Sequence, residues 1–310
     1  MNTKFRNNHF ASRRRSADRY FWGGALSLAV ILTGARAAAN DSVADFSLEE
    51  LINVKVTSVS KKEQNLFDAA TAISVISNED IRRSGASSLP EALRLVPGLG
   101  VAAVNSSQWA ITSRGHNQLY ANKLLVLVDG RGIYTPNFAG VFWDLQQPML
   151  EDVDRIEVIR GPGGTIWGAN AVNGVINVTT RSAKDTQGGL IYGGGGDTLQ
   201  TMGGGRYGGK LGPDTYYRAF AGYQLRDDYP LANGQPAGDN WQSGQVGFRL
   251  DHYVEADTHL TWQADATGLE LGNDGSDAGN INSLGRWTRE FSDRASIQAQ
   301  VYYDHTFRQG

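Results

Sequence analysis

The sequence predicts two parts in one chain of 310 residues: a small α+β domain, followed by the antiparallel strands of a transmembrane β-barrel. Three observations support this fold class. Up to about residue 187, strand-like apolar runs alternate with helical patterns, which is typical of an α+β domain. Beyond that point alternation of period two takes over, and 23 of the 38 glycines fall in residues 188–310. The chain also begins with the features of an export signal.

The composition excludes several classes of protein. Because the chain has no Cys, it cannot hold a disulfide scaffold, a zinc-thiolate site or an iron–sulfur cluster. No run of 18 apolar residues is present, which argues against a helical membrane protein. The absence of a long apolar run does not argue against a membrane β-barrel, because the strands of a barrel carry only a weak alternating signal. The net charge of -3 argues against a nucleic-acid binder.

Residues 1–39 predict a signal peptide. An apolar stretch at 20–33 and small residues at 37–39 follow a basic start, and we expect cleavage before Asn40. The basic start contains Lys4, Arg6, Arg13, Arg14, Arg15 and Arg19, and Arg36 is the seventh basic residue of the segment. An amphipathic anchor or a short transmembrane helix is the alternative, but the apolar run is too short to span a bilayer. Without this segment the basic residues fall from 29 to 22 and the acidic residues from 32 to 31, which leaves a net charge of -9.

Two short helices are predicted in the α+β domain. The first begins at a cap formed by Ser77–Asp80 and ends at Gly85. The second begins at a capping box of Ser88 and Glu91, and its helical spacing continues to Val96. Five strands are expected, at residues 73–76, 110–113, 123–129, 156–160 and 175–180. These elements predict a hydrophobic core that belongs to this domain alone.

About seven strands are predicted between residues 188 and 310. In 296–307 most odd positions are apolar and most even positions are polar, so such a strand has one apolar and one polar face. Short turns at 209–214, 255–258 and 292–294 alternate with longer links at 227–240 and 272–280, as in membrane barrels. A soluble β-sandwich would show similar alternation. The export signal and the unequal loops favour the barrel.

Three segments of the first half resemble the plug domain of TonB-dependent outer-membrane receptors. They are residues 154–162 with their continuation to 180, residues 125–131 and residues 111–115, and their order and spacing are also similar to the family's. The resemblance covers residues 46–187. It implies a signal peptide at 1–39, a periplasmic segment at 40–60, a plug at 61–187 and the first part of a β-barrel at 188–310.

The resemblance implies an energy-coupled importer of a scarce ligand, either a ferric siderophore or a cobalamin-like metal complex. Its partners would be a TonB-type energy-coupling protein of the inner membrane, the metal-chelate ligand and outer-membrane lipid. We expect a monomer in the outer membrane that binds no nucleic acid, with no catalytic residue, cofactor or resident metal. The alternatives are an outer-membrane barrel enzyme, for which no nucleophile–base pair is visible, and a passive porin-like channel, which needs no plug.

The resemblance also assigns candidate site residues. A TonB box is expected at Val54, Lys55, Val56, Thr57, Ser58 and Val59, where β-branched residues suit strand addition, unless this is the plug's own first strand. Ligand contacts are expected from Asn105, Gln108, Trp109, Tyr134, Phe138, Phe142 and Trp143, with packing against the barrel wall as an equal alternative. Contacts between plug and barrel are expected from Arg114, Arg155, Glu157 and Arg160, with solvated charges as the alternative.

Two weaker candidates concern metals. His116 in a predicted loop could be a haem or metal ligand, but a single loop histidine is more often an ordinary polar residue. Asp274 and Asp277 lie in a Gly/Asn-rich loop, but they lack the regular spacing of a calcium-binding loop.

The length predicts an incomplete barrel. A plug that ends near residue 187 leaves 123 of the 310 residues for the wall. Closure around a plug takes about 22 strands of about 9 to 11 residues, hence over ~200 residues before loops. We therefore expect about seven of about 22 strands in this chain. The chain ends at Gln309-Gly310 rather than at the terminal aromatic typical of such barrels, in agreement with this expectation.

Overall fold

The computed structural model describes residues 55–56, 64–65 and 71–309, except for 116, 136, 137, 139, 169, 273, 274, 293 and 294. These residues all lie in the second of the chain's two compact units, Asp41–Gly310. The predicted signal peptide at 1–39 lies outside the described residues. Within the described part, none of the helices has the length and apolarity needed to cross a membrane.

The first half is an α+β domain, called the plug below, built on a five-stranded sheet in the order β3-β8-β9-β6-β7. Its strands are β3 (Ile73–Ser77), β6 (Leu124–Val128), β7 (Arg131–Gly132), β8 (Val153–Arg160) and β9 (Gly174–Thr180). All pairs are antiparallel except β6 with β9, which is parallel. A separate antiparallel hairpin is formed by β4 (Leu99–Ala103) and β5 (Trp109–Ser113). The five predicted strands are thereby confirmed, with shifted ends.

The first helix, α2 (Asn78–Ser84), begins and ends as predicted. Ser77 and Asp80 form a capping box, and Gly85 ends the helix with a φ of 69°, a conformation that favours glycine. The remaining plug helices are α3 (Leu89–Leu93) and α4 (Gly164–Trp167), with 3-10 turns η3 (Leu150–Asp152) and η4 (Lys184–Thr186).

The capping box predicted for α3 is wrong. Ser88 makes no side-chain cap hydrogen bond, and the helix ends at Leu93, short of Val96. The Glu91 carboxylate instead accepts hydrogen bonds from the backbone N–H of Ser87 at 2.8 Å and from Arg226 at 2.9 Å. The guanidinium of Arg226, distant in sequence, thus takes part of the carboxylate's bonding capacity.

The plug has a hydrophobic core of its own. Both faces of its sheet carry buried apolar side chains, and β6 is buried along its whole length. The largest fully buried apolar side chains of this core are Leu89, Leu93, Ile156 and Ile176, with Val126, Val153, Val158 and Val175.

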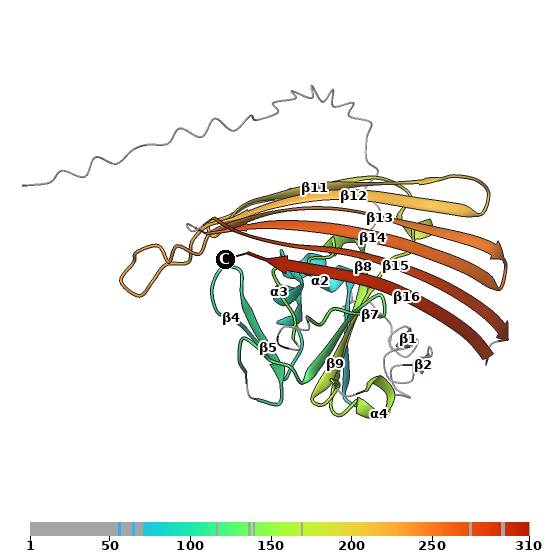
Figure 1. The fold of residues 1–310 in the computed structure, drawn as a ribbon, viewed down its shortest axis with the longest axis horizontal. Coiled ribbons are helices and arrows are strands. Elements are labelled where there is room, and N and C mark those ends of the chain that lie inside the picture. The colour runs from blue at the N-terminus through green and yellow to red at the C-terminus, as the bar shows by residue number, and fades with distance from the viewer. Residues whose placement is uncertain are drawn as a thin grey trace, which may run out of the picture. The chain divides into compact units, whose positions relative to one another are not determined.

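The second half is one seven-stranded antiparallel sheet, called the wall below, in which each strand pairs with its neighbours in sequence. Its strands are β10 (Gly188–Gly194), β11 (Leu199–Lys210), β12 (Thr215–Arg226), β13 (Trp241–Glu255), β14 (Thr258–Leu271), β15 (Ser276–Ser292) and β16 (Ala295–Arg308). Figure 1 shows them as one curved layer with α2, α3 and β8 on its concave side. The predicted strand number is confirmed.

The loops agree only in part with expectation. Residues 227–240 join β12 to β13 as a long link, and the strand ends beside this link are called the long-loop end. The long link predicted at 272–280 is wrong, because β15 already begins at Ser276. Residues 276–280 pair in register with 267–271 of β14, so their backbone groups are bonded in the ladder.

The exposure of the two faces of the wall distinguishes a membrane barrel from a soluble β-sandwich. On the outward face Val246, Trp262 and Val301 are 56%, 53% and 75% exposed. On the face toward the plug, Arg249 and Gln263 are buried. A soluble sandwich would bury the apolar face instead, so the sandwich alternative is wrong.

Candidate functional site

The candidate functional site is the interface between the plug and the polar inner face of the wall. Wall arginines meet plug carboxylates along it. The pairs are Arg206 with Asp152, Arg218 with Asp152 at 3.3 Å, Arg226 with Glu91 at 2.9 Å, and Arg308 with Asp144; Arg131 of the plug pairs in the opposite sense with Asp304 of the wall. These ion pairs are directional and largely buried. An apolar cluster of Leu145 with Trp241, Leu269 and Ala278 adds to the contact.

Asp129 lies at the centre of this interface, in the tight turn between β6 and β7, with a φ of 49°. Its carboxylate accepts hydrogen bonds from the N–H and hydroxyl of Thr180, both at 2.8 Å, and from Gln263 of the wall at 3.0 Å. Burial alone would raise the pKa of Asp129, but the Arg249 guanidinium and these hydrogen bonds outweigh it and lower the pKa. Asp129 therefore remains ionised and connects two plug strands to the wall.

Two wall arginines face each other directly in this region. Arg218 of β12 is the cross-strand partner of Arg249 of β13, a like-charge pair that is unfavourable without compensation. Asp152 compensates Arg218, and Asp251 pairs with Arg249 at 2.9 Å. Asp251 also accepts the backbone N–H of Ala183 at 2.6 Å, which attaches the end of the plug to the wall.

A second set of contacts lies at the long-loop end, where the β4–β5 loop reaches the wall. The N–H of Ser106 donates to the carboxylate of Asp239 at 2.8 Å. The indole N–H of buried Trp241 donates to the Ser106 carbonyl at 2.8 Å, and the Arg226 guanidinium lies 5.8 Å from the indole ring centroid. Plug loop and 227–240 link are thus connected by hydrogen bonds.

Three of the expected ligand-contact residues belong to the plug's own packing. Trp109 and Trp143 are 5% and 7% exposed and pack in its core. The Tyr134 hydroxyl donates to the Leu124 carbonyl at 2.7 Å, and burial raises the pKa of Tyr134 to about 12. Direct ligand contact by these three residues stays a prediction.

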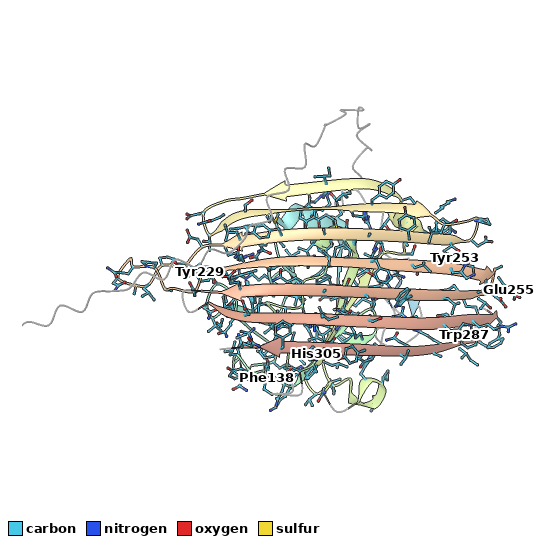
Figure 2. All side chains as sticks on the ribbon, turned by 45° about the horizontal axis from the view of Figure 1, so that its top comes forward. Phe138, Tyr229, Tyr253, Glu255, Trp287 and His305 are labelled. Atoms are coloured by element: carbon cyan, nitrogen blue, oxygen red, sulfur yellow. The ribbon has the colours of Figure 1, made fainter. Side chains whose placement is uncertain are left out.

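The other four expected ligand-contact residues are partly exposed. Asn105 accepts the N–H of Gln108 at 2.7 Å, which shapes the β4–β5 loop. The Phe138 ring lies edge-on to Phe142 and to Tyr120, with centroids 5.0 and 4.8 Å apart. Figure 2 shows Phe138 toward the end of the molecule that carries Tyr229 of the long link. Their contact with a ligand also stays a prediction.

The charged residues expected at the plug–barrel contact bond within the plug. Arg155 pairs with Glu157 at 2.8 Å and Asp154 at 2.7 Å, and Glu157 is fully buried. Arg160 donates to the Pro97 carbonyl at 2.6 Å, and exposed Arg114 donates to the Arg160 carbonyl at 3.2 Å. A role against the barrel stays a prediction for Arg114, Arg155, Glu157 and Arg160.

The expected TonB box is described only at β1 (Lys55–Val56). These residues pair antiparallel with β2 (Gln64–Asn65), so their backbone adopts the strand conformation that strand addition needs. Val54, Thr57, Ser58 and Val59 lie outside the described residues, as do His116 and Asp274. Among the residues that the structure describes, no group of three or more His, Asp or Glu side chains could hold a metal ion.

Sequence reasoning missed the residues that make the interface. The plug carboxylates are Glu91, Asp129, Asp144 and Asp152; the wall arginines are Arg206, Arg218, Arg226, Arg249, Arg286 and Arg308. One signal was available in the sequence. Several of the alternating strands carry an arginine on their polar face, and a row of inward positive charges needs acidic partners. The acids themselves come from separate turns and helices, so no spacing marks them.

Comparison with known proteins identifies related chains. Residues 65–175 match the family model of the TonB-dependent receptor plug domain. The vitamin B12 transporter BtuB of Vibrio vulnificus is 33% identical over 147 residues, which cover 47% of this chain and 23% of the transporter. The hemin receptor of Yersinia enterocolitica is 31% identical over 180 residues, or 56% of this chain and 25% of the receptor. The chain thus spans about a quarter of the length of these curated relatives.

Solved structures share the fold at lower sequence identity. The siderophore receptor PirA from Acinetobacter baumannii superposes with a TM-score of 0.61 at 17% identity, over 76% of this chain and 40% of the receptor. The copper transporter OprC gives a TM-score of 0.61 at 20% identity, over 76% of this chain and 37% of the transporter. These superpositions extend beyond the plug, so they include wall strands.

Proposed function

We propose that this chain, which belongs to the TonB-dependent receptors, forms the plug and the adjoining wall of an energy-coupled importer in a bacterial outer membrane. The observation that carries the proposal is the placement of side chains on the wall. Its polar face is buried against the plug, while its apolar face is exposed. Such a sheet is suited to lipid outside and a plugged polar lumen inside.

The height of the apolar face supports a membrane-spanning wall. Along β14 the outward positions run from Leu260 through Trp262, Ala264 and Ala266 to Gly268, and the next outward position is Glu270. The eight steps from Leu260 to Gly268, at about 3.4 Å each, give roughly 27 Å along the strand, or about 21 Å of height at a strand tilt of about 40°. An outer-membrane barrel has an apolar band about 25 Å tall. We propose a monomer surrounded by outer-membrane lipid.

The proposed ligand is a scarce metal chelate, either a ferric siderophore or a cobalamin-like complex. The relatives' names support this class, since they include a vitamin B12 transporter, a hemin receptor and a siderophore receptor. The ligand would meet the partly exposed side chains of the β4–β5 loop and the Phe138 cluster at the long-loop end. Long loops face outward in this class of barrel.

Energy would come from the inner-membrane proton gradient through a TonB-type coupling protein. That partner would capture the segment around Lys55–Val56 by adding a β-strand. The polar plug–wall interface suits this step, because charged groups such as Arg226 and Glu91 become hydrated when the plug moves and water enters, whereas an apolar interface would expose apolar surface to water. Family membership and the presence of a plug favour this function over a passive porin or a barrel enzyme.

The test is uptake by a Val56→Pro variant, with Val56→Ile as the matched control. Proline removes a backbone donor from the proposed added strand, whereas isoleucine keeps it. We expect Val56→Pro to lose uptake but keep ligand binding, and Val56→Ile to keep both. Whole-cell uptake and binding are measured over a panel of ferric siderophores, haem and cobalamins. Uptake that persists without the coupling protein would contradict the proposal.

A further inference from the structure

A groove with a glycine floor lies on the outward face of the wall, near its long-loop end. The strand register places Tyr223, Gly244, Gly268, Gly279 and Phe307 next to one another across five strands. Residues of this row line a groove of about 480 Å³. A Cβ added at Gly244 or Gly268 would meet no atom within 4 Å, so the floor is open.

Aromatic side chains form the two walls of the groove. The Phe307 ring lies over Gly279, where an added Cβ would come within 2.6 Å of it, and Tyr223 stands on the opposite side. The open floor between them covers β13 and β14, which is roughly 10 Å at the usual strand spacing. This width accommodates an extended acyl chain.

The rim of the groove toward the long loops is polar and negatively charged. The Tyr223 hydroxyl donates to Gln242 at 2.8 Å, and the Gln242 amide donates to the Glu270 carboxylate at 2.6 Å. Glu270 is the direct cross-strand partner of Asp277, and both are exposed. Two facing carboxylates repel each other, and a cation placed between them relieves the repulsion.

We propose that this groove binds one acyl chain of a membrane lipid whose head group carries a primary ammonium, held at Glu270 and Asp277. The inference rests on the proposed placement of the wall in a membrane. Within a bilayer, groove and lipid tails are equally apolar, so selectivity comes from close packing on the glycine floor and from the charged rim. The lipid is therefore selected by its head group and retained by the shape of the groove.

The test is native mass spectrometry of the full chain purified in detergent. The probes are 1-palmitoyl lysophosphatidylethanolamine and its lysophosphatidylglycerol counterpart, which differ in the head-group ammonium. Gly268→Leu fills the floor. Ala299→Leu adds the same side chain on the same outward face of the wall, at an exposed position of β16 outside the groove. We expect the original chain and Ala299→Leu to retain the ethanolamine lipid about tenfold better than the glycerol lipid, and Gly268→Leu to lose that adduct.

A second variant separates charge from shape. In the double variant Glu270→Gln, Asp277→Asn, the groove keeps its form, and both lipids should bind equally. Equal lipid retention by Gly268→Leu and Ala299→Leu, or an unchanged preference in the double variant, would overturn the inference. Uptake measured on Gly268→Leu distinguishes the two proposals, because import should persist when the lipid no longer binds. If the original chain shows the lipid preference but never imports a ligand, the lipid site is supported and the proposed import function is contradicted.

Discussion

The plug and the wall bury opposite kinds of side chain. In the plug, Leu93, Ile156 and Val158 are fully buried, as in a water-soluble domain. In the wall, Val301 is 75% exposed while Asp251 is 2% exposed. The two regions are therefore adapted to different surroundings. The plug meets water and polar groups on its outside, whereas the wall has a polar interior contact and an apolar exterior suited to lipid.

The two regions also differ in how their strands are connected. Each wall strand pairs with its sequence neighbour, while the plug sheet pairs β3 with β8 and β6 with β9 across long intervals. Pairing between sequence neighbours needs no distant segment, so the order of the wall strands follows from alternation and from the links between consecutive strands. The plug needs its hydrophobic core to bring distant strands together.

The largest expected effect tests the plug core. Leu93→Ala removes a fully buried side chain and should lower the free energy of unfolding of the plug by about 2–5 kcal/mol. Leu95→Ala is the control, because Leu95 is 44% exposed and should stay within about 0.5 kcal/mol of the original chain. Urea unfolding followed by tryptophan fluorescence measures both. Similar losses would show that the core is not where the structure places it.

The next effect tests the outward face of the wall. Ala266→Arg puts a charge within the apolar band and should destabilise the wall in a bilayer by about 2–4 kcal/mol. Glu270→Arg, at the polar rim of the same strand, should cost about 0–1 kcal/mol. Urea titrations after refolding into lipid vesicles measure the difference. If position 266 tolerated arginine as well as position 270, the apolar face would not lie in lipid.

A smaller effect tests the contact between the two regions. Trp241→Phe replaces the indole by a smaller aromatic ring and removes the N–H that donates to the Ser106 carbonyl. An unsatisfied buried acceptor costs about 1–3 kcal/mol. Hydrogen–deuterium exchange in the β4–β5 loop should rise accordingly. Trp262→Phe, on the exposed face, is the control and should leave this loop unchanged. Equal exchange in both variants would contradict the contact.

The smallest effect is a pH dependence at Glu91. Burial would raise the pKa of this carboxyl, but Arg226 and the hydrogen bonds from Ser87 outweigh it and lower the pKa. A carboxyl whose pKa is lowered by folding stabilises the folded state above its unfolded pKa, 4.5, and loses that contribution as the pH falls through the folded value. The urea midpoint should therefore fall on acidification, and fall less in Glu91→Gln. An identical pH profile for both chains would refute this assignment.

Several elements follow from local sequence. The cap at Ser77 and the glycine at 85 bound α2 because side-chain and backbone bonding there involves residues at most four apart. The same holds for the alternation in β12 to β16, since consecutive side chains of a strand point to opposite faces. The motifs between residues 111 and 180 indicated the plug family, which the family match at 65–175 confirms.

The interface, in contrast, depends on contacts between distant parts of the chain. Asp129 and Gln263 are 134 residues apart in sequence, and Arg226 and Glu91 are 135 apart. The arginine takes up bonding capacity of Glu91 that local reasoning had assigned to a helix cap. Similarly, Trp109 and Trp143 are aromatic loop residues in the sequence but pack in the plug core.

Local sequence patterns are sufficient for the fold class, the number of wall strands and the apolar and polar sides of each strand, because these depend on the fixed geometry of a short stretch of backbone. The folded structure is needed to see that the polar side is the buried one, which carboxylate meets each arginine and which aromatic side chains remain exposed. These outcomes depend on how the plug sheet and the wall pack together. Packing joins residues whose separation along the chain carries no periodic signal.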